Sequence, residues 1–144
     1  MSSTTAHLAN YPARYFAAWN QRDIDVALAV IADDIEWIDP SLPEPLTDRA
    51  GAKWFFESAW AAFPDIVFEP VGQPLVDERL GRVAHEWVMR GNYTGSGFPP
   101  GVEPTGNRFE LGGCDVWNVD ASGRAVRVRA FYDAGDFVRQ LGLA

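Results

Sequence analysis

Polar side chains that could transfer protons occur in this sequence at positions where hydrophobic residues are expected. In residues 107–119 the odd positions are mostly apolar, including Phe109, Leu111 and Trp117, and Asp115 shares their parity. Side chains two positions apart in a strand lie on one face of the sheet, so we expect Asp115 on the apolar face. Full burial raises the pKa of a carboxyl group by roughly 3–5 units, so Asp115 would be a neutral acid that donates a hydrogen bond at neutral pH.

The adjacent Gly112 and Gly113 leave a second interpretation of this strand open. Glycine pairs often accompany a β-bulge, and a bulge here would reverse the register and turn Asp115 into water. The same glycines would also allow a long strand to bend, as a strongly curved sheet requires.

Asp39 and Tyr15 are the other two candidates for proton transfer. Asp39 ends a short apolar segment and has the parity of Ile35 and Trp37, which predicts that it points inward; a surface Asp-Pro turn is the alternative. Tyr15 lies on the apolar stripe of a predicted helix. A tyrosine there is commonly a core residue whose hydroxyl finds a nearby acceptor, so its role depends on what surrounds it.

Four further residues are candidate pocket residues or alternative acids and bases. His85 and Tyr93 share the apolar parity of one predicted strand, so His85 is either a proton shuttle or a histidine of the core. Trp117 is one of several aromatic residues that could surround a flat apolar ligand. Asp133 follows the last strand with the parity of Arg129, which favours the surface or the rim of a pocket.

Composition excludes several classes of function. The chain has 144 residues with 20 acidic and 12 basic side chains, and a net charge of −8 disfavours nucleic acid and anionic membranes as partners. Its two histidines have no partner at metal-ligand spacing, and the glycine-rich residues 95–101 lack the lysine of a phosphate-binding loop. We therefore expect no metal and no cofactor. With a single cysteine and no signal-peptide pattern, we expect a cytoplasmic protein.

The spacing of apolar residues predicts helices first and strands afterwards. Spacings of three and four change to alternation near the middle of the chain. This order predicts an α+β fold of one domain, residues 1–144, in which about three N-terminal helices pack on one face of a curved, mostly antiparallel sheet. The predicted helices are residues 8–20, 23–31, 47–63 and 137–141, and the predicted strands are residues 35–39, 66–71, 82–93, 107–119 and 124–132.

Several of these segments resemble a known family. Residues 15–20 (YFAAWN), 23–25 (DID) and 32–40 (ADDIEWIDP) resemble the opening of the bacterial steroid Δ-isomerases, and residues 115–131 are similar to their late pair of strands. These enzymes belong to the nuclear-transport-factor-like superfamily. The resemblance implies a cone-shaped half-barrel around an internal apolar pocket.

The resemblance also implies roles for individual residues. In that family a tyrosine of the first helix and a protonated aspartic acid of the late strand hold the carbonyl oxygen, and an aspartate before a proline moves the proton. Tyr15, Asp115 and Asp39 lie at the matching positions. We therefore expect a cofactor-free enzyme that enolises a small apolar carbonyl compound, with steroid- or polyketide-like molecules as ligands.

A second resemblance leaves an alternative function open. Residues 104–109 and 133–142 are similar to the SnoaL-like polyketide cyclases, in which an aspartate at the position of Asp133 acts as acid and base in an aldol ring closure. Those enzymes carry a histidine where this chain has Tyr93. A non-catalytic ligand-binding domain of the same fold is a third possibility. Relatives of this fold often dimerise through the open sheet, so a homodimer is compatible with either resemblance.

Overall fold

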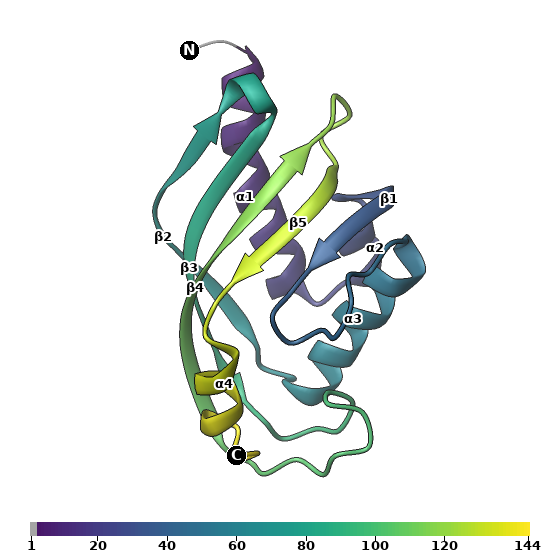
Figure 1. Ribbon diagram of the computed structural model, residues 1–144, viewed down its shortest axis with the longest axis vertical. Helices are drawn as coiled ribbons and strands as arrows, with labels where there is room; N and C mark the ends of the chain where they lie inside the picture. Colours follow the sequence, from purple (N-terminus) through teal and green to yellow (C-terminus); the bar gives the residue numbers. More distant parts are fainter. Residues whose placement is uncertain (1–2) are drawn as a thin grey trace.

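The helices of the protein cover one side of a curved sheet (Figure 1). The computed structural model describes residues 3–144. Helix α1 (Ser3–Gln21) buries residues at helical spacing, among them Tyr11, Tyr15 and Trp19, and it packs on β2 and β3. Two shorter helices, α2 (Ile24–Leu28) and α3 (Arg49–Ala62), begin at aspartate caps whose side chains accept backbone N–H groups.

The five strands form one mixed sheet in the order β1-β5-β4-β3-β2. Only the pair of β1 and β5 is parallel, and the other pairs are antiparallel, which confirms the predicted mostly antiparallel sheet. Strand β4 therefore lies at the centre, where both of its edges are paired. The strands are β1 (Ile31–Ile38), β2 (Val67–Asp77), β3 (Arg82–Asn92), β4 (Arg108–Val119) and β5 (Ala125–Phe131); a 3-10 turn, η1 (Glu78–Leu80), connects β2 to β3.

Aromatic side chains fill the space between the helices and the concave face of the sheet. Trp19 of α1 lies 4.6 Å from Phe56 of α3 and 6.4 Å from Trp37 of β1, between ring centroids. Trp87 of β3 and Trp117 of β4 are almost completely buried on the sheet side. Offset and edge-to-face aromatic pairs of this kind add stability beyond the area that they bury.

Three local expectations were wrong. Ile31 begins β1 and does not belong to the second helix, because it is fully buried where β1 pairs with Ala125 of β5. Strand β2 continues past residue 71 to Asp77 through an irregular register between Val71 and Leu75. The predicted helix 137–141 begins three residues earlier, since α4 (Ala134–Gln140) is capped by the Asp133 carboxylate.

The alternative interpretation, a bulge at the glycine pair, is wrong, because β3 and β4 pair without a register shift through both residues. Gly113 is required for a different reason. A Cβ atom at this position would lie 2.5 Å from the Trp87 ring and 2.7 Å from the carbonyl oxygen of Phe131. The glycine thus lets the Trp87 indole approach the backbone of β4 closely, next to the site described below.

The loop from β3 to β4, residues 93–107, runs beneath the end of α3 at the base of the molecule (Figure 1). Gly95 donates its N–H to the carbonyl of Ala62, and a Cβ atom on Gly95 would clash with the Ala61 carbonyl at 1.8 Å. This close approach holds the loop against α3. No helix within residues 3–144 combines the length and the apolar composition needed to cross a membrane.

Candidate active site

A small cavity lies between the helices and the concave face of the sheet, and all three predicted proton-transfer residues line it. Its volume is about 50 Å³, and Tyr15, Asp39 and Asp115 reach it from α1, the end of β1 and β4. The rest of its lining is mostly aromatic and aliphatic, including Trp87 and Phe63. An apolar cavity with a few converging polar groups is the usual form of a small-molecule site.

Tyr15 presents a protonated hydroxyl to this cavity. The residue is 2% exposed, and its ring lies 5.0 Å from Trp117 and 6.1 Å from Trp37, between centroids. Burial raises the pKa of the Tyr15 hydroxyl well above its ordinary value, and the nearby Asp115 raises it further. The hydroxyl is therefore a hydrogen-bond donor at every pH at which the protein would work.

Asp115 is on the buried face of the central strand, as its parity predicted. It is 3% exposed and is flanked by His85 on β3 and Ala130 on β5. Burial raises the pKa of Asp115 to about 8, and the negative charge of Asp39 contributes to the rise; Trp87 and Tyr15 partly oppose it. Asp115 is thus a neutral acid at pH 7, and its Oδ1 atom has no hydrogen-bond partner among the described residues.

Asp39 is held as a hydrogen-bond acceptor at the end of β1. Its Oδ1 accepts the backbone N–H of Ser41 at 2.8 Å and also the hydroxyl of Tyr132. Burial raises the pKa of Asp39, and these two hydrogen bonds oppose the rise because they stabilise the ionised form. A backbone N–H and a hydroxyl thus both support the negative charge of Asp39.

Burial raises the pKa of both carboxyl groups, but their surroundings separate the two pKa values. A charge on Asp39 raises the pKa of Asp115 across the same apolar cavity. Two donors support the charge on Asp39, whereas Asp115 is surrounded mainly by rings. Environments that separate the pKa values of two neighbouring carboxyl groups are typical of a site with one base and one acid.

Tyr132 was not predicted from the sequence, although it contacts the candidate base directly. Its hydroxyl donates to Asp39 and lies 2.6 Å from the Ser41 hydroxyl, and its ring lies 6.0 Å from Trp87. A signal was present, because Val128, Ala130 and Tyr132 share the even parity of the last strand. It could have been found by extending that buried face by one position beyond β5.

The remaining candidate residues do not line the cavity. His85 is buried, and its Nε2 atom lies 3.1 Å from the carbonyl oxygen of Gly72. Tyr93 packs against Phe63 at the base of the sheet, and Trp117 packs behind Tyr15.

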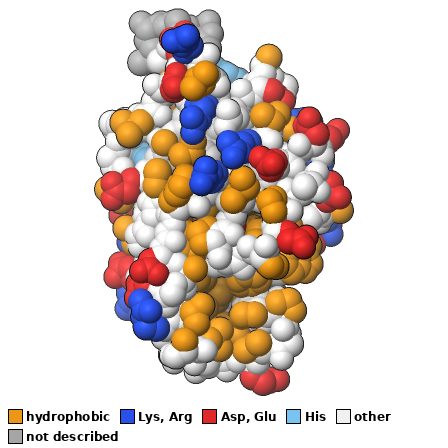
Figure 2. All heavy atoms as spheres, in the orientation of Figure 1, with side chains coloured by type: hydrophobic (Ala, Val, Ile, Leu, Met, Phe, Trp, Pro, Cys, Tyr) orange, Lys and Arg blue, Asp and Glu red, His pale blue; other side chains and the backbone are white. Residues whose placement is uncertain are grey.

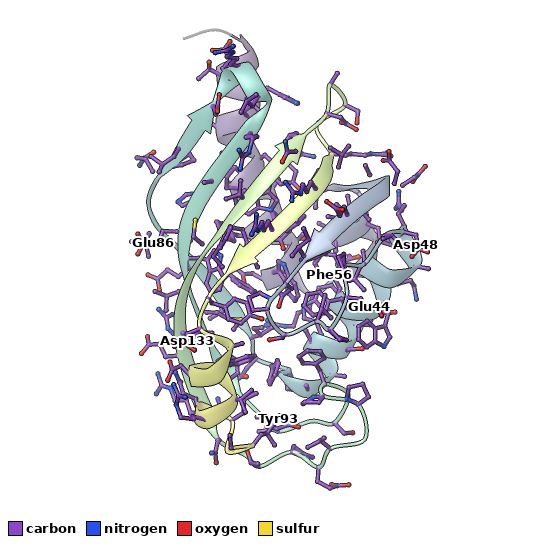
Figure 3. All side chains as sticks on the ribbon, viewed as in Figure 1. Glu44, Asp48, Phe56, Glu86, Tyr93 and Asp133 are labelled. Atoms are coloured by element: carbon purple, nitrogen blue, oxygen red, sulfur yellow. The ribbon has the colours of Figure 1, made fainter. Side chains whose placement is uncertain are left out.

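Asp133 lies at the start of α4 in Figure 3, where it is exposed and accepts the backbone N–H of Asp136. This placement agrees with the expectation of a surface or rim position. A helix N-cap of this kind has a structural role that does not depend on the cavity. Among the described residues, no group of three or more His, Cys, Asp and Glu side chains could hold a metal ion.

The neutral state of Asp115 predicts a specific pH dependence of stability. Because its pKa is about 8 in the folded chain and near 3.8 when unfolded, only the unfolded state releases this proton between those values. The wild type should therefore lose about 1.4 kcal/mol per pH unit relative to Asp115→Asn as pH rises from 4 to 8, with no further loss above that range. Urea unfolding of both proteins at several pH values measures the difference. Parallel pH profiles would contradict the assignment.

A family model described as a SnoaL-like domain matches residues 13–128. No curated protein sequence matches the chain significantly. Solved structures do match.

A protein from Xanthomonas campestris pv. campestris, described as a polyketide cyclase, is 22% identical with a TM-score of 0.82, covering 96% of this chain and 99% of its own. A protein from Jannaschia sp. CCS1, described as a SnoaL-like polyketide cyclase, is 16% identical with a TM-score of 0.84. The match covers 100% of this chain and 97% of the Jannaschia chain. TerC, crystallised with polyporic acid, is 17% identical with a TM-score of 0.74, and the match covers 94% of this chain and 98% of TerC. At these identities the likeness shows the fold.

Proposed function

The chain belongs to the SnoaL-like domain family, and on that premise we propose that it is an acid–base enzyme that enolises an apolar carbonyl compound without a cofactor. The observation that carries the proposal is the meeting of Tyr15, Asp39 and Asp115 in one apolar cavity, where Asp115 is a neutral acid at pH 7 and two hydrogen-bond donors support the charge of Asp39. A ligand-binding domain without catalysis would not need two carboxyl groups in such different environments.

Each residue has a defined part in the proposed reaction. The Asp39 carboxylate removes a proton from the carbon next to the carbonyl, and the electron pair of that C–H bond moves onto the carbonyl oxygen. Tyr15 and neutral Asp115 donate hydrogen bonds to this oxygen as it becomes negative. Asp39 then returns the proton to another carbon of the conjugated system, which gives an isomer of the substrate and regenerates the carboxylate.

The expected contributions are large enough to account for catalysis. One oxyanion donor in a water-excluded site lowers the barrier by roughly 2.7–4 kcal/mol, and a positioned base contributes on the order of 10²–10⁴-fold. Both donors are held by packing before a substrate binds, since the rings around Tyr15 and Asp115 leave them little freedom.

Conversion of β,γ-unsaturated ketones to their conjugated isomers tests the proposal. The product absorbs in the ultraviolet, so a panel of compounds can be followed without knowledge of the natural substrate. We expect conversion of at least the smaller members of the panel above the rate in buffer. A protein that binds these ketones but converts none of them would be a ligand-binding domain.

A second candidate function is aldol ring closure, which the solved structures described as polyketide cyclases favour. It would begin with the same enolate, whose carbon would attack a second carbonyl of the substrate. The exposed Asp133 is poorly placed to be its base, because it caps α4 outside the cavity. Loss of ring closure in Asp39→Asn but not in Asp133→Asn would support closure through the cavity; the reverse would support the role of Asp133 implied by the resemblance.

Tyr132 is proposed as a positioning residue for the base, and Tyr132→Phe tests this role. Its hydroxyl lowers the pKa of Asp39, so its removal should raise that pKa and move the acid limb of the pH profile of kcat/KM to higher pH. A merely structural role would lower activity equally at every pH. Tyr93→Phe is the matched control, since it removes a buried hydroxyl outside the cavity and should leave the acid limb in place.

A further inference from the structure

The inner cavity is too small to hold a complete polycyclic or long-chain substrate. Its volume of about 50 Å³ accommodates a few water-sized groups, whereas sites for larger ligands usually measure roughly 300–1,000 Å³. A carbonyl group and its neighbouring carbons could reach Asp39 and Asp115 there. The rest of a larger substrate would need another compartment.

A second hollow of about 460 Å³ adjoins the cavity on the outside of the protein. We call it the outer groove. Four parts of the chain that are distant in sequence form it: residues 40–43 after β1, Trp54 of α3, residues 98–100 of the loop between β3 and β4, and residues of α4 and the C-terminal tail between positions 134 and 143. Figure 2 shows hydrophobic side chains gathered over the lower part of this face, where these segments meet.

Two residues line both the outer groove and the cavity. Phe98 and Phe137 line both, and Ser41 of the groove lies 2.6 Å from the Tyr132 hydroxyl that contacts the candidate base. Phe137 is packed among Phe63, Phe109 and Tyr132. The partition between the two spaces is therefore only one layer of aromatic side chains thick.

Phe98 is the more movable part of this partition. Its described ring neighbours are Phe55 at 5.9 Å and Trp54 at 6.5 Å, and Trp54 is itself 43% exposed. Phe98 also belongs to a loop, whereas Phe137 belongs to a helix. Phe98 lies outside the sheet, so a passage beside it would not require any strand to move.

We propose that the outer groove binds the apolar body of the substrate while its carbonyl end enters the inner cavity past Phe98. This inference rests on the proposed function, and it assigns the substrate class: an uncharged carbonyl compound that carries an alkyl chain or ring system. The lining of the groove favours this occupant, because among the described residues that form it only Ser41 carries a hydroxyl and none is charged. A charged tail would lose its hydration there without gaining a partner.

A series of para-alkylphenols tests the inference by binding alone. The phenol group imitates the enolate in the cavity, and the alkyl chain should extend into the groove. We expect affinity, measured by calorimetry, to rise from phenol to para-hexylphenol by up to about threefold to fourfold per methylene, until the chain reaches the open end. An affinity that does not change with chain length would overturn the inference.

Val138→Glu tests whether the rise of affinity with chain length arises in the groove, because Val138 lines the groove on α4 but does not line the cavity. The ratio of the affinities for para-hexylphenol and phenol should fall by at least about tenfold, since the new charge meets the buried chain. The matched control is Val71→Glu on β2, outside both spaces, which should keep the wild-type ratio. A ratio unchanged by Val138→Glu would contradict the inference.

Two further readouts distinguish failure of the groove assignment from failure of the proposed function. Phenol binding that is insensitive to Asp115→Leu, with the chain-length effect intact, would contradict the proposed function and leave the groove assignment standing. If Val138→Glu changes the sedimentation coefficient of the protein instead of the affinity ratio, a second copy of the chain covers the groove and the ligand assignment is wrong.

Discussion

Replacement of Asp39 by asparagine is expected to lower kcat for ketone isomerisation by about 10²–10⁴-fold, the contribution of a positioned general base. An amide cannot accept the proton, yet it has nearly the same size. Its carbonyl oxygen can still accept the Ser41 N–H and the Tyr132 hydroxyl that now bind the carboxylate. The cavity should therefore keep its shape while it loses its base.

Initial rates of the ultraviolet change measure this effect, and phenol binding measures whether the cavity is intact. Asp39→Asn should bind phenol with an affinity no lower than that of the wild type, since a negative charge facing the ligand has been removed. Asp34→Asn is the matched control, because Asp34 is exposed on β1, the strand that Asp39 directly follows. Equal kcat values for Asp39→Asn and the wild type would show that Asp39 is not the base.

Replacement of Asp115 by leucine is expected to lower kcat by about 10²–10³-fold, the usual cost of one oxyanion donor. Leucine fills a similar volume but donates no hydrogen bond. Asp115→Asn retains an N–H donor and should lose less. This order of activities, wild type above asparagine above leucine, distinguishes loss of a donor from loss of packing.

The pH profile gives the same prediction an independent test. The pKa of Asp115 is about 8, so above that pH the carboxylate forms and can no longer donate to the oxyanion. kcat of the wild type should therefore fall above about pH 8, whereas Asp115→Asn should lack this basic limb. A basic limb of equal size in both proteins would assign it to another group.

Much of the fold could be predicted because the spacing of the apolar residues directly indicates which segments form helices and which form strands. The stripe that contains Tyr15 defines α1, and the alternation around Asp115 defines the buried face of β4. Parity placed Asp115 correctly because β3 and β4 pair without a bulge at the adjacent glycines. Where a strand was irregular, as in β2 after Val71, a pattern of period two could not follow it.

The parts that were missed depend on contacts between distant segments. Gly113 is explained by the indole of Trp87 on the neighbouring strand, and no local pattern indicates that approach. The hydrogen bond from Tyr132 to Asp39 joins residues that are 93 positions apart. The size of the cavity and its partition by Phe98 likewise follow from packing between a loop and α3.

The most direct test of the central claim is exchange of hydrogen for deuterium at the carbon next to the carbonyl of a small ketone, followed by proton NMR in heavy water. This measurement needs no natural substrate and reports only the removal of the proton. We predict exchange well above the buffer rate with the wild type and a return close to the buffer rate with Asp39→Asn. Exchange at the same rate with both proteins, or none above buffer with either, would contradict the claim that Asp39, Tyr15 and Asp115 together form an enolising site.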